Sequence, residues 1–299
     1  MENKEVIIIG GSYAGLSAAM ALGRSLRDVL IIDSGKPCNR QTPHSHNFIT
    51  QDGKTPKEIS DLAKEQVLKY KTVTFHEGKV VKIIKNEDDF EVETANGEKF
   101  NAKKIILASG VKDMMPDIPG FAECWGISVI HCPYCHGYEV KGKTTGIMAN
   151  GDMAFDFTKL VFNLTKEVTL FTNGKSALNE EQTEKFNQHK INIIEDEIAE
   201  ILHKNGQIQK VILKNGKEIP LEALYAKIPF EQNINVDDLG IELNENRFIK
   251  VDTMMKTNIP GIFACGDNTT MMRSVANAVA QGNFAGAVVN KELSEEDFI

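Results

Sequence analysis

The stretch that decides the fold is "EVIIIGGSYAGLSAAMALGRSLRDVLIIDSG", residues 5–35. Its apolar, β-branched start predicts a strand over residues 6–9, and two adjacent glycines then predict a tight turn. The apolar spacing that follows predicts a helix, and "DVLII" predicts a second strand. The residues expected to share the buried face of this helix are Leu16, Ala19, Leu22 and Leu26. A strand, a glycine turn, a helix and a strand in this order are typical of a nucleotide-binding βαβ unit.

The glycine turn predicts a site for a pyrophosphate. Gly10, Ser12 and Gly15 stand at the three small-residue positions of G-x-G-x-x-G. Gly10 allows the sharp turn and Gly15 allows close packing, while the middle position lets the backbone approach the phosphates at the helix N-terminus. Ser12 departs from glycine, but it is small and its hydroxyl can donate to a phosphate. Asp33 ends the second strand, where a carboxylate can bind ribose hydroxyls. An ordinary βαβ turn is the alternative, but these features together predict dinucleotide binding.

A second, poorer copy of this unit follows in "KTTGIMANGDMAFDFTKLVFNLTKEVTLFTNG", residues 143–174. Its fingerprint positions read Ala149, Gly151 and Ala154, so the first glycine is lost. Thr172 stands where the first copy has an acid, and no arginine cluster follows to bind a 2′-phosphate. The repeat predicts a second dinucleotide-type domain. Because neither the NAD nor the NADP pattern is satisfied, the sequence puts NADP(H) binding in question.

The segment between the two copies favours an FAD domain over a plain NAD domain. Thr55 and Glu58, around Pro56, predict a helix that begins with a capping box. Residues 73–110 then alternate in polarity and turn at Asn96–Gly97, which predicts a β-meander that returns to a buried strand, "KIILAS".

Composition and charge exclude several classes of protein. The chain has 299 residues, of which 41% are hydrophobic and 25% charged, which is enough for two ordinary domains. The formal charge of −8 argues against nucleic acid or an anionic membrane as a partner. No apolar run is long enough to span a bilayer, and the N-terminus lacks a signal-peptide layout. We therefore expect a cytoplasmic protein.

The segment "HCPYCHGY", residues 131–138, contains a closely spaced cysteine pair. Zinc normally requires four ligands, but no second pair exists and the flanking His131 and His136 are poorly placed to share an ion with both sulfurs, so we predict no metal site. Accidental spacing in a core is another alternative. A redox couple fits better, because a helix N-terminus favours a thiolate at C-x-x-C. His136 could move protons, although a purely structural role stays open, and a structural role is expected for His131. The remaining three of the five cysteines are expected to be inert thiols: Cys38, Cys124 and Cys265.

Over nearly its whole length the chain resembles the thioredoxin reductase family of low-molecular-weight flavoproteins. The segments that carry the resemblance are "GGSYAGLSAA", "ILASG", "CPYCHGYE" and "NIPGIFACGDNTTMMRSVANAVAQG". The resemblance implies an α/β fold with two Rossmann-like, three-layer ββα dinucleotide-binding domains and a homodimer. It places the FAD-binding domain at residues 1–115 and 245–299. Residues 116–244 would form the inserted second domain, which carries the cysteine pair.

The resemblance also implies roles for individual residues. Cys135 would lie against the flavin, and Cys132 would exchange with the substrate. The residues implied to contact FAD, besides those of the first glycine turn and Asp33, are Ser109, Gly110, Gly266, Asp267, Arg273, Ser274 and Val275. The chain departs from the family pattern at Ser109 (usually threonine), at Ser274 (usually glutamine) and at His136, where ordinary reductases have the aspartate that serves as the active-site acid.

"CPYCHGYE", together with the missing arginines, resembles the branch that includes the gliotoxin and holomycin dithiol oxidases. Those enzymes use FAD and a C-x-x-C pair and lack a working NADPH site. "HSHNFITQDGKTP", residues 44–56, also resembles that branch and would place His44, His46 and Asn47 near the flavin.

The sequence therefore predicts an FAD-dependent thiol–disulfide oxidoreductase. Cys132 and Cys135 would exchange two electrons between flavin and a dithiol or disulfide, either a small molecule or a thioredoxin-like protein. Three alternatives stay open: a thioredoxin reductase that holds NADPH in an unusual way, a reductase supplied by ferredoxin or flavodoxin, and a non-enzymatic, flavin-bound redox sensor.

Overall fold

The structure is a computed structural model that describes residues 2–298, and the chain divides into two compact units. Unit 1 takes the ranges Met1–Arg40, Phe48–Lys112 and Phe230–Ile299, and unit 2 takes Gln41–Asn47 and Asp113–Pro229. The short range Gln41–Asn47 is separated in sequence from the rest of unit 2 but belongs to it by its contacts. The domain limits expected from the sequence stay a prediction.

Unit 1 is built on a seven-stranded sheet of order β3-β2-β1-β6-β5-β4, with β17 also paired to β6. β1, β2, β3, β6 and β17 run parallel, whereas β4, β5 and β6 form an antiparallel meander. The meander turns at Gly97 (φ +80°), as the Asn-Gly pair predicts. The strands are β1 (Glu2–Ile9), β2 (Val29–Asp33), β3 (Val73–Glu77), β4 (Val80–Lys85), β5 (Phe90–Thr94), β6 (Lys99–Leu107) and β17 (Ile262–Ala264).

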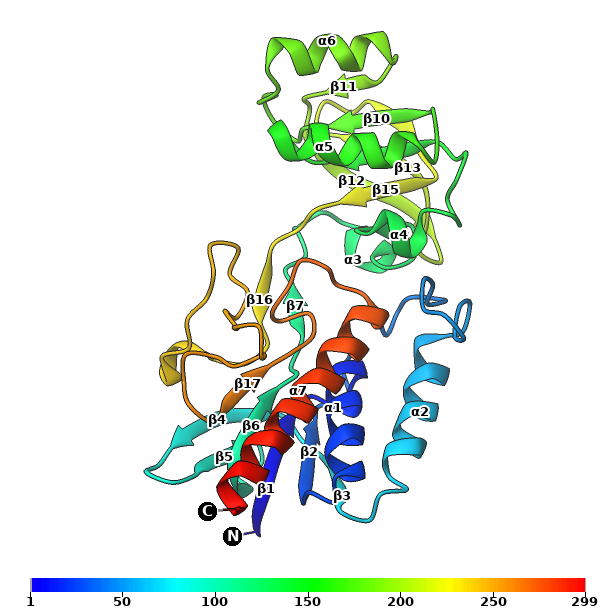
Figure 1. Cartoon of the computed structure of the whole chain (residues 1–299). Helices are drawn as coiled ribbons and strands as arrows, with labels where there is room; N and C mark the ends of the chain where they lie inside the picture. Colours follow the sequence, from blue (N-terminus) through cyan, green and yellow to red (C-terminus); the bar gives the residue numbers. More distant parts are fainter. Residues whose placement is uncertain (1, 299) are drawn as a thin grey trace. The chain divides into compact units, whose positions relative to one another are not determined.

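Three helices cover one face of this sheet (Figure 1): α1 (Tyr13–Arg24), α2 (Pro56–Val67) and α7 (Val275–Asp297). α2 begins with the predicted capping box, in which Thr55 and Glu58 satisfy each other's backbone N–H groups. The expectation for Leu26 is wrong, because α1 ends at Arg24 and Leu26 has a φ of +62° and is 80% exposed. The other face of the parallel strands packs against β4 and β5 of the meander. It also packs against residues 234–251, which include a 3₁₀ helix, η1 (Asp237–Leu239).

α1 and α7 lie unusually close together because small residues line their contact (Figure 1). A β-carbon on Gly282 would lie 2.0 Å from the carbonyl oxygen of Ala14, and one on Gly286 would lie 2.6 Å from that of Ala18. Such distances exclude any larger side chain at either glycine without a shift of backbone. The contact fixes the N-terminal part of α7 against the first glycine turn.

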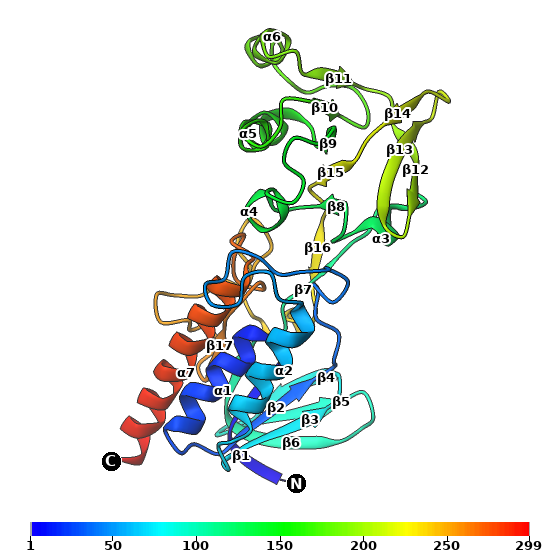
Figure 2. The same ribbon diagram turned by 90° about the vertical axis from the view of Figure 1, so that its right-hand side faces the viewer.

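Unit 2 repeats the architecture of unit 1, as Figure 2 shows: helices lie on one side of a parallel sheet and an antiparallel sheet lies on the other. The parallel order is β11-β10-β9-β15-β8, and the antiparallel order is β12-β13-β14. Its strands are β8 (Val129–Ile130), β9 (Thr145–Met148), β10 (Val168–Phe171), β11 (Asn192–Ile194), β12 (Ile198–Lys204), β13 (Gln207–Leu213), β14 (Glu218–Pro220) and β15 (Ala223–Ala226). Its helices are α3 (Phe121–Cys124), α4 (Pro133–His136), α5 (Gly151–Phe162) and α6 (Glu180–Gln188).

The chain changes unit four times: on either side of Gln41–Asn47, and twice more at two short paired strands, β7 (Val111–Asp113) and β16 (Phe230–Gln232). Both units are Rossmann-like with three layers, and both are discontinuous in the sequence; this α/β architecture confirms the predicted fold class. In residues 2–298 no helix combines the length and the apolar character that crossing a membrane requires.

Candidate active site

The first glycine turn joins β1 to α1 in a conformation that only glycine accommodates. Gly10 has a φ of +106°, and a β-carbon there would lie 2.2 Å from the carbonyl oxygen of Ala108. A β-carbon on Gly15 would lie 1.8 Å from the carbonyl oxygen of Gly10. Ser12 is the N-cap of α1, and its side chain makes no capping hydrogen bond. The first amides of α1 therefore keep donors for an anion.

Asp33 lies at the carboxyl end of β2, beside this turn. Its carboxylate accepts hydrogen bonds from the backbone N–H of Gly11 at 3.0 Å and of Gly35 at 3.1 Å. These two bonds fix the acid at the edge of the sheet where ligands of Rossmann-like units bind. The predicted juxtaposition of Asp33 with the glycine turn is present.

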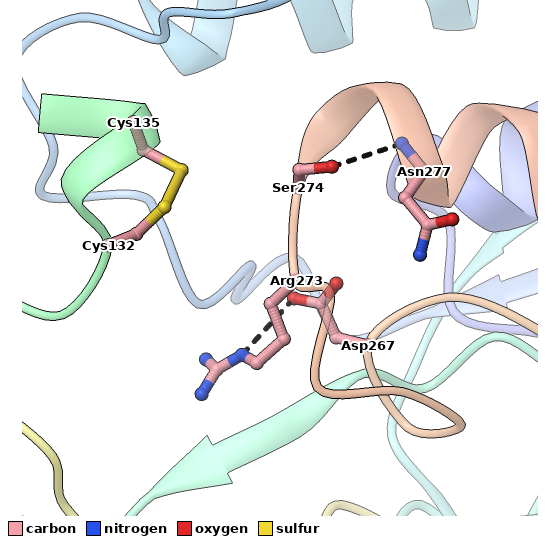
Figure 3. The surroundings of a disulfide bond; sticks show 6 residues. All are labelled: Cys132, Cys135, Asp267, Arg273, Ser274 and Asn277. Carbon is pink, nitrogen blue, oxygen red and sulfur yellow. Dashed lines mark hydrogen bonds and ion pairs between the residues drawn. A yellow bond between two sulfur atoms is a disulfide. The ribbon is translucent and has the colours of Figure 1, made fainter. Parts of the chain in front are cut away.

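The turn after β17 comes to the same edge of unit 1. Gly266 has a φ of +88°, and a β-carbon there would lie 2.9 Å from the β-carbon of Ala14. The Gly266 N–H donates to Gln281 Oε1 at 2.8 Å. Arg273 Nε lies 3.6 Å from Asp267 Oδ2, and Ser274 caps α7 by accepting a hydrogen bond from the backbone N–H of Asn277; Figure 3 draws both interactions. The segment is therefore held at both its ends.

The residues at this edge fit a bound flavin nucleotide. The backbone of Gly10 and of Gly266 approaches closely without side chains, and α1 presents N–H donors at its start. Two buried side-chain oxygens, Ser109 Oγ and Asn268 Oδ1, have no hydrogen-bond partner within residues 2–298. Buried polar atoms are normally paired, so these two are suited to groups of a ligand.

In the corresponding turn of unit 2, the Asn150 side chain accepts a hydrogen bond at the start of the helix. Asn150 caps α5, and its Oδ1 accepts from the N–H of Gly151 and from the N–H of Ala177, each at 2.8 Å. Its amide also donates to the carbonyl oxygen of Lys175 at 2.9 Å. We call residues 175–177 the strap. Asn150 therefore takes up the first N–H of α5 and joins it to the strap, at the helix start where a pyrophosphate binds in a nucleotide-binding unit.

Cys132 and Cys135 form a disulfide in unit 2, with 5.3 Å between their Cα atoms (Figure 3). Cys132 is the N-cap of α4 and Pro133 follows at the first helical position, so the pair lies at the start of a short helix as the sequence predicts. Cys124 and Cys265 are buried free thiols. Burial raises the pKa of Cys124 to about 11, so this thiol stays protonated near neutral pH.

His136 ends α4, one residue after Cys135. Its Nδ1 is buried, and no partner for it occurs in the described chain. Burial lowers the pKa of His136; the Glu139 carboxylate acts in the opposite sense and His46 lowers it further. The imidazole is therefore biased toward the neutral form, which can accept a proton. Glu139 Oε1 lies 3.5 Å from His46 Nε2.

The structure divides the predicted site residues between the units. Unit 2 holds the disulfide, His136 and Asn47, which has a φ of +60° and is exposed. Unit 1 holds the remaining candidates, which are Gly10, Ser12, Gly15, Asp33, Ser109, Gly110, Gly266, Asp267, Arg273, Ser274 and Val275. Across residues 2–298 no group of three or more His, Cys, Asp or Glu side chains is arranged to hold a metal ion.

Sequence reasoning missed three residues that shape these regions: Gln281, Asn150 and Glu139. Gln281 accepts from both Gly266 and Thr269, Asn150 holds the strap, and Glu139 meets His46. For Asn150 a signal existed, since asparagine replaces a small residue just before a helix start and is a favoured N-cap. For the other two, the contact joins segments that are distant in the sequence.

Comparison with known proteins identifies the family. Residues 4–282 match the model of the family described as pyridine nucleotide-disulphide oxidoreductase. The thioredoxin reductase tcpT of Claviceps purpurea is 34% identical over 97% of this chain and 94% of its own length. A putative thioredoxin reductase, TrxB, from Bacillus anthracis shares the fold with a TM-score of 0.94 at 31% identity, covering 99% of this chain and 100% of that one. HlmI has a TM-score of 0.92 at 27% identity, covering 99% of this chain and 94% of that one.

The chain belongs to the pyridine nucleotide-disulphide oxidoreductases. Within them it is an FAD-dependent thiol–disulfide oxidoreductase of the thioredoxin reductase type. The similarity to tcpT and to HlmI confirms the predicted branch.

Proposed function

We propose that this enzyme oxidises a dithiol to a disulfide through Cys132 and Cys135, with FAD as cofactor and without an ordinary nicotinamide site. The observation that carries the proposal is the contrast between the two glycine turns. The first has N–H donors and close backbone approach. At the second, Asn150 and the strap take the place of a pyrophosphate.

FAD would be held in unit 1 by four groups of residues. Gly10, Ser12 and Gly15 would bind the pyrophosphate, and Asp33 would bind the adenosine ribose. Gly266 and Asp267 would line the ribityl and pyrophosphate, with Ser109 and Gly110 beside them. Arg273, Ser274, Val275 and Asn47 would lie near the ring system. When bound, FAD supplies a two-electron acceptor that returns the reduced cysteine pair to the disulfide.

The chemistry of the protein residues is a pair of thiol–disulfide exchanges. A substrate thiol gives its proton to His136, and the thiolate attacks Cys132 Sγ. A mixed disulfide forms as the Cys132–Cys135 bond breaks, and its electron pair leaves on Cys135 Sγ. The second substrate thiol loses its proton to solvent, and the resulting thiolate attacks the substrate sulfur of the mixed disulfide, which releases the oxidised substrate and leaves Cys132 as a thiolate. A bound flavin would in turn be reoxidised by oxygen or by another two-electron acceptor.

We further propose a homodimer in the cytoplasm, whose substrate is a small dithiol or a thioredoxin-like protein and which does not bind nucleic acid or membranes. The net charge of −8 supports the exclusion of polyanionic partners. One finding favours a second candidate: several relatives, including tcpT, carry the name thioredoxin reductase. In that case the same residues would reduce a protein disulfide with electrons from a non-nicotinamide donor.

Stopped-flow reduction of the flavin in the purified holoenzyme tests the proposal. We expect dithiothreitol to bleach the flavin in a single phase whose rate rises with its concentration, and we expect micromolar NADPH to leave the flavin oxidised over the same time. Rapid bleaching by NADPH would overturn the absence of a nicotinamide site.

Two cysteine variants serve as controls for the route of the electrons. Cys132→Ser and Cys135→Ser should both keep the visible absorbance of bound flavin, and neither should be reduced by dithiothreitol. Reduction of either variant at the wild-type rate would show that the cysteine pair is not on the path.

A further inference from the structure

One segment of unit 1 carries five of the residues proposed to contact FAD. We call residues 266–275, which lead from β17 to the first residue of α7, the flavin segment. Its members among the proposed contacts are Gly266, Asp267, Arg273, Ser274 and Val275. Residues 265–274 belong to no helix or strand, so no regular pattern of backbone hydrogen bonds fixes their conformation.

The start of the flavin segment is a tight turn that meets one oxygen atom of α7. The Thr269 N–H donates to the Gly266 carbonyl oxygen at 3.0 Å, which closes the turn around Asp267. Gln281 Oε1 accepts from the Gly266 N–H at 2.8 Å and lies 3.0 Å from Thr269 Oγ1. The α7 helix therefore sets the direction in which this turn presents Asp267.

The end of the flavin segment meets the same face of α7. Asn277 Nδ2 donates to the carbonyl oxygen of Met272 at 3.0 Å. The backbone N–H of Asn277 donates to Ser274 Oγ at 3.2 Å, as Figure 3 shows. Asn277 and Gln281 are four residues apart, and side chains at this spacing are neighbours on the surface of a helix. One face of α7 thus holds the flavin segment near both of its ends.

α7 is in turn fixed against the start of α1, where the pyrophosphate is proposed to bind. A β-carbon on Gly282 would lie 2.0 Å from the carbonyl oxygen of Ala14, and one on Gly266 would lie 2.9 Å from the Ala14 β-carbon. The Ser17 hydroxyl donates to the carbonyl oxygen of Val279 at 2.7 Å. The flavin segment, α7 and α1 therefore converge at Ala14, and the two amides of α7 act from a fixed helix.

We propose that Gln281 and Asn277 are positioning residues for FAD: their side-chain amides hold the flavin segment in the conformation that receives the cofactor. The inference deepens the proposed function and rests on the placement of FAD made there. A segment that is already ordered loses less conformational entropy when its ligand binds, so both amides should raise the affinity for flavin. Replacing Gln281 would also leave the buried Gly266 N–H without its acceptor, which is unfavourable and should open the turn.

The dissociation constant of FAD, measured by titrating the full-length apoprotein, tests the inference. Three variants each replace an amide of α7 by an apolar side chain of similar size: Gln281→Met, Asn277→Leu and the control Asn290→Leu. Asn290 Oδ1 accepts from Arg27 Nε at 2.9 Å, so the control removes a comparable hydrogen bond of α7 outside the flavin segment. We expect the Kd to rise about tenfold in Q281M and about threefold in N277L, and to stay at the wild-type value in N290L.

Hydrogen exchange separates a positioning role from a merely structural one. In the apoprotein, the backbone amides of residues 266–269 should exchange roughly tenfold faster in Q281M than in the wild type, and at the wild-type rate in N290L. Gln281→Glu keeps oxygen acceptors at the same reach, so exchange in its turn should stay as slow as in the wild type. Fast exchange in Q281E, or slow exchange in Q281M, would overturn the role of Gln281.

Thermal unfolding of the apoproteins completes the test. Q281M and N290L each lose a hydrogen bond of α7, and both should have a lower Tm than the wild type. If both are destabilised and Q281M still binds FAD as tightly as N290L, the Gln281 amide is only structural and the positioning role is wrong. Should Q281M fail to fold, the same comparison of N277L with N290L decides the question. The proposed function fails separately, if dithiothreitol does not reduce the flavin of the wild-type holoenzyme.

Discussion

The two glycine turns of this protein follow the same strand–turn–helix plan but satisfy the helix start in different ways. In unit 1 the Ser12 side chain makes no capping hydrogen bond. A β-carbon on Gly10 would lie 2.2 Å from the carbonyl oxygen of Ala108, so only glycine fits there. In unit 2, Asn150 accepts from Gly151 and Ala177. The difference indicates that a βαβ unit can fold without binding a phosphate, because one capping side chain can make hydrogen bonds that a phosphate would otherwise make.

The largest effect should come from adding one methyl group at each turn. Gly15→Ala would place a β-carbon 1.8 Å from the Gly10 carbonyl oxygen, so we expect loss of bound flavin and a stability loss of about 3 kcal/mol. Gly151→Ala meets nothing closer than 3.6 Å, and its positive φ should cost only about 1 kcal/mol with flavin retained. Thermal unfolding and the visible flavin absorbance measure both. Equal effects at the two turns would contradict the contrast between them.

The residues at the carboxyl end of the second strand of each copy, Asp33 in β2 and Thr172 directly after β10, sharpen the comparison. Asp33→Asn removes a carboxylate oxygen that accepts backbone N–H donors, and we expect flavin affinity to fall about tenfold. Thr172→Val removes a hydroxyl that donates to the carbonyl oxygen of Gly174, which should cost about 1 kcal/mol of stability and leave flavin affinity unchanged. Flavin titration of the apoprotein separates the two. A loss of flavin affinity in the Thr172 variant would contradict the assignment.

The hydrogen bonds that Asn150 makes at the second glycine turn can be removed by one substitution. Asn150→Ala deletes the bonds to Gly151, Ala177 and Lys175, so we expect the strap to loosen at a cost of about 1 kcal/mol. Hydrogen exchange of residues 175–177 should accelerate, while exchange of the first turn of α1 stays as in the wild type. Unchanged protection of the strap would show that other contacts hold it.

The smallest effect concerns His136. In unit 2 the reactive groups lie at α4, the helix that carries the disulfide, and not at the glycine turn. Because the native pKa of His136 is lowered, native and unfolded chains bind the same number of protons above about pH 6.5. Below that, the unfolded chain binds a proton that the native protein does not, so this contribution to stability is lost as pH falls. Urea midpoints between about pH 7 and pH 5 should fall more steeply in the wild type than in His136→Gln. Parallel curves would show that His136 titrates normally.

Local patterns predicted much of this molecule, and particular residues show why. Thr55 and Glu58 cap α2 as their spacing indicates, and Gly97 turns the meander, because each device acts within a few residues of chain. Leu26 was placed wrongly for the same reason: apolar periodicity continues past Arg24, but the helix does not. Apolar periodicity indicates which residues would share one face of a helix, but it does not indicate at which residue the helical hydrogen bonds end.

The amino-acid sequence by itself determined the two dinucleotide-type units, the class of enzyme and the cysteine pair at a helix start, since these depend on spacings that local geometry enforces. Only the tertiary structure decided that Asn150 reaches the strap and that His46 meets Glu139. Each of those contacts joins segments separated by many residues, and side-chain hydrogen bonds and ion pairs of that kind form only where packing brings the two segments within a few ångströms.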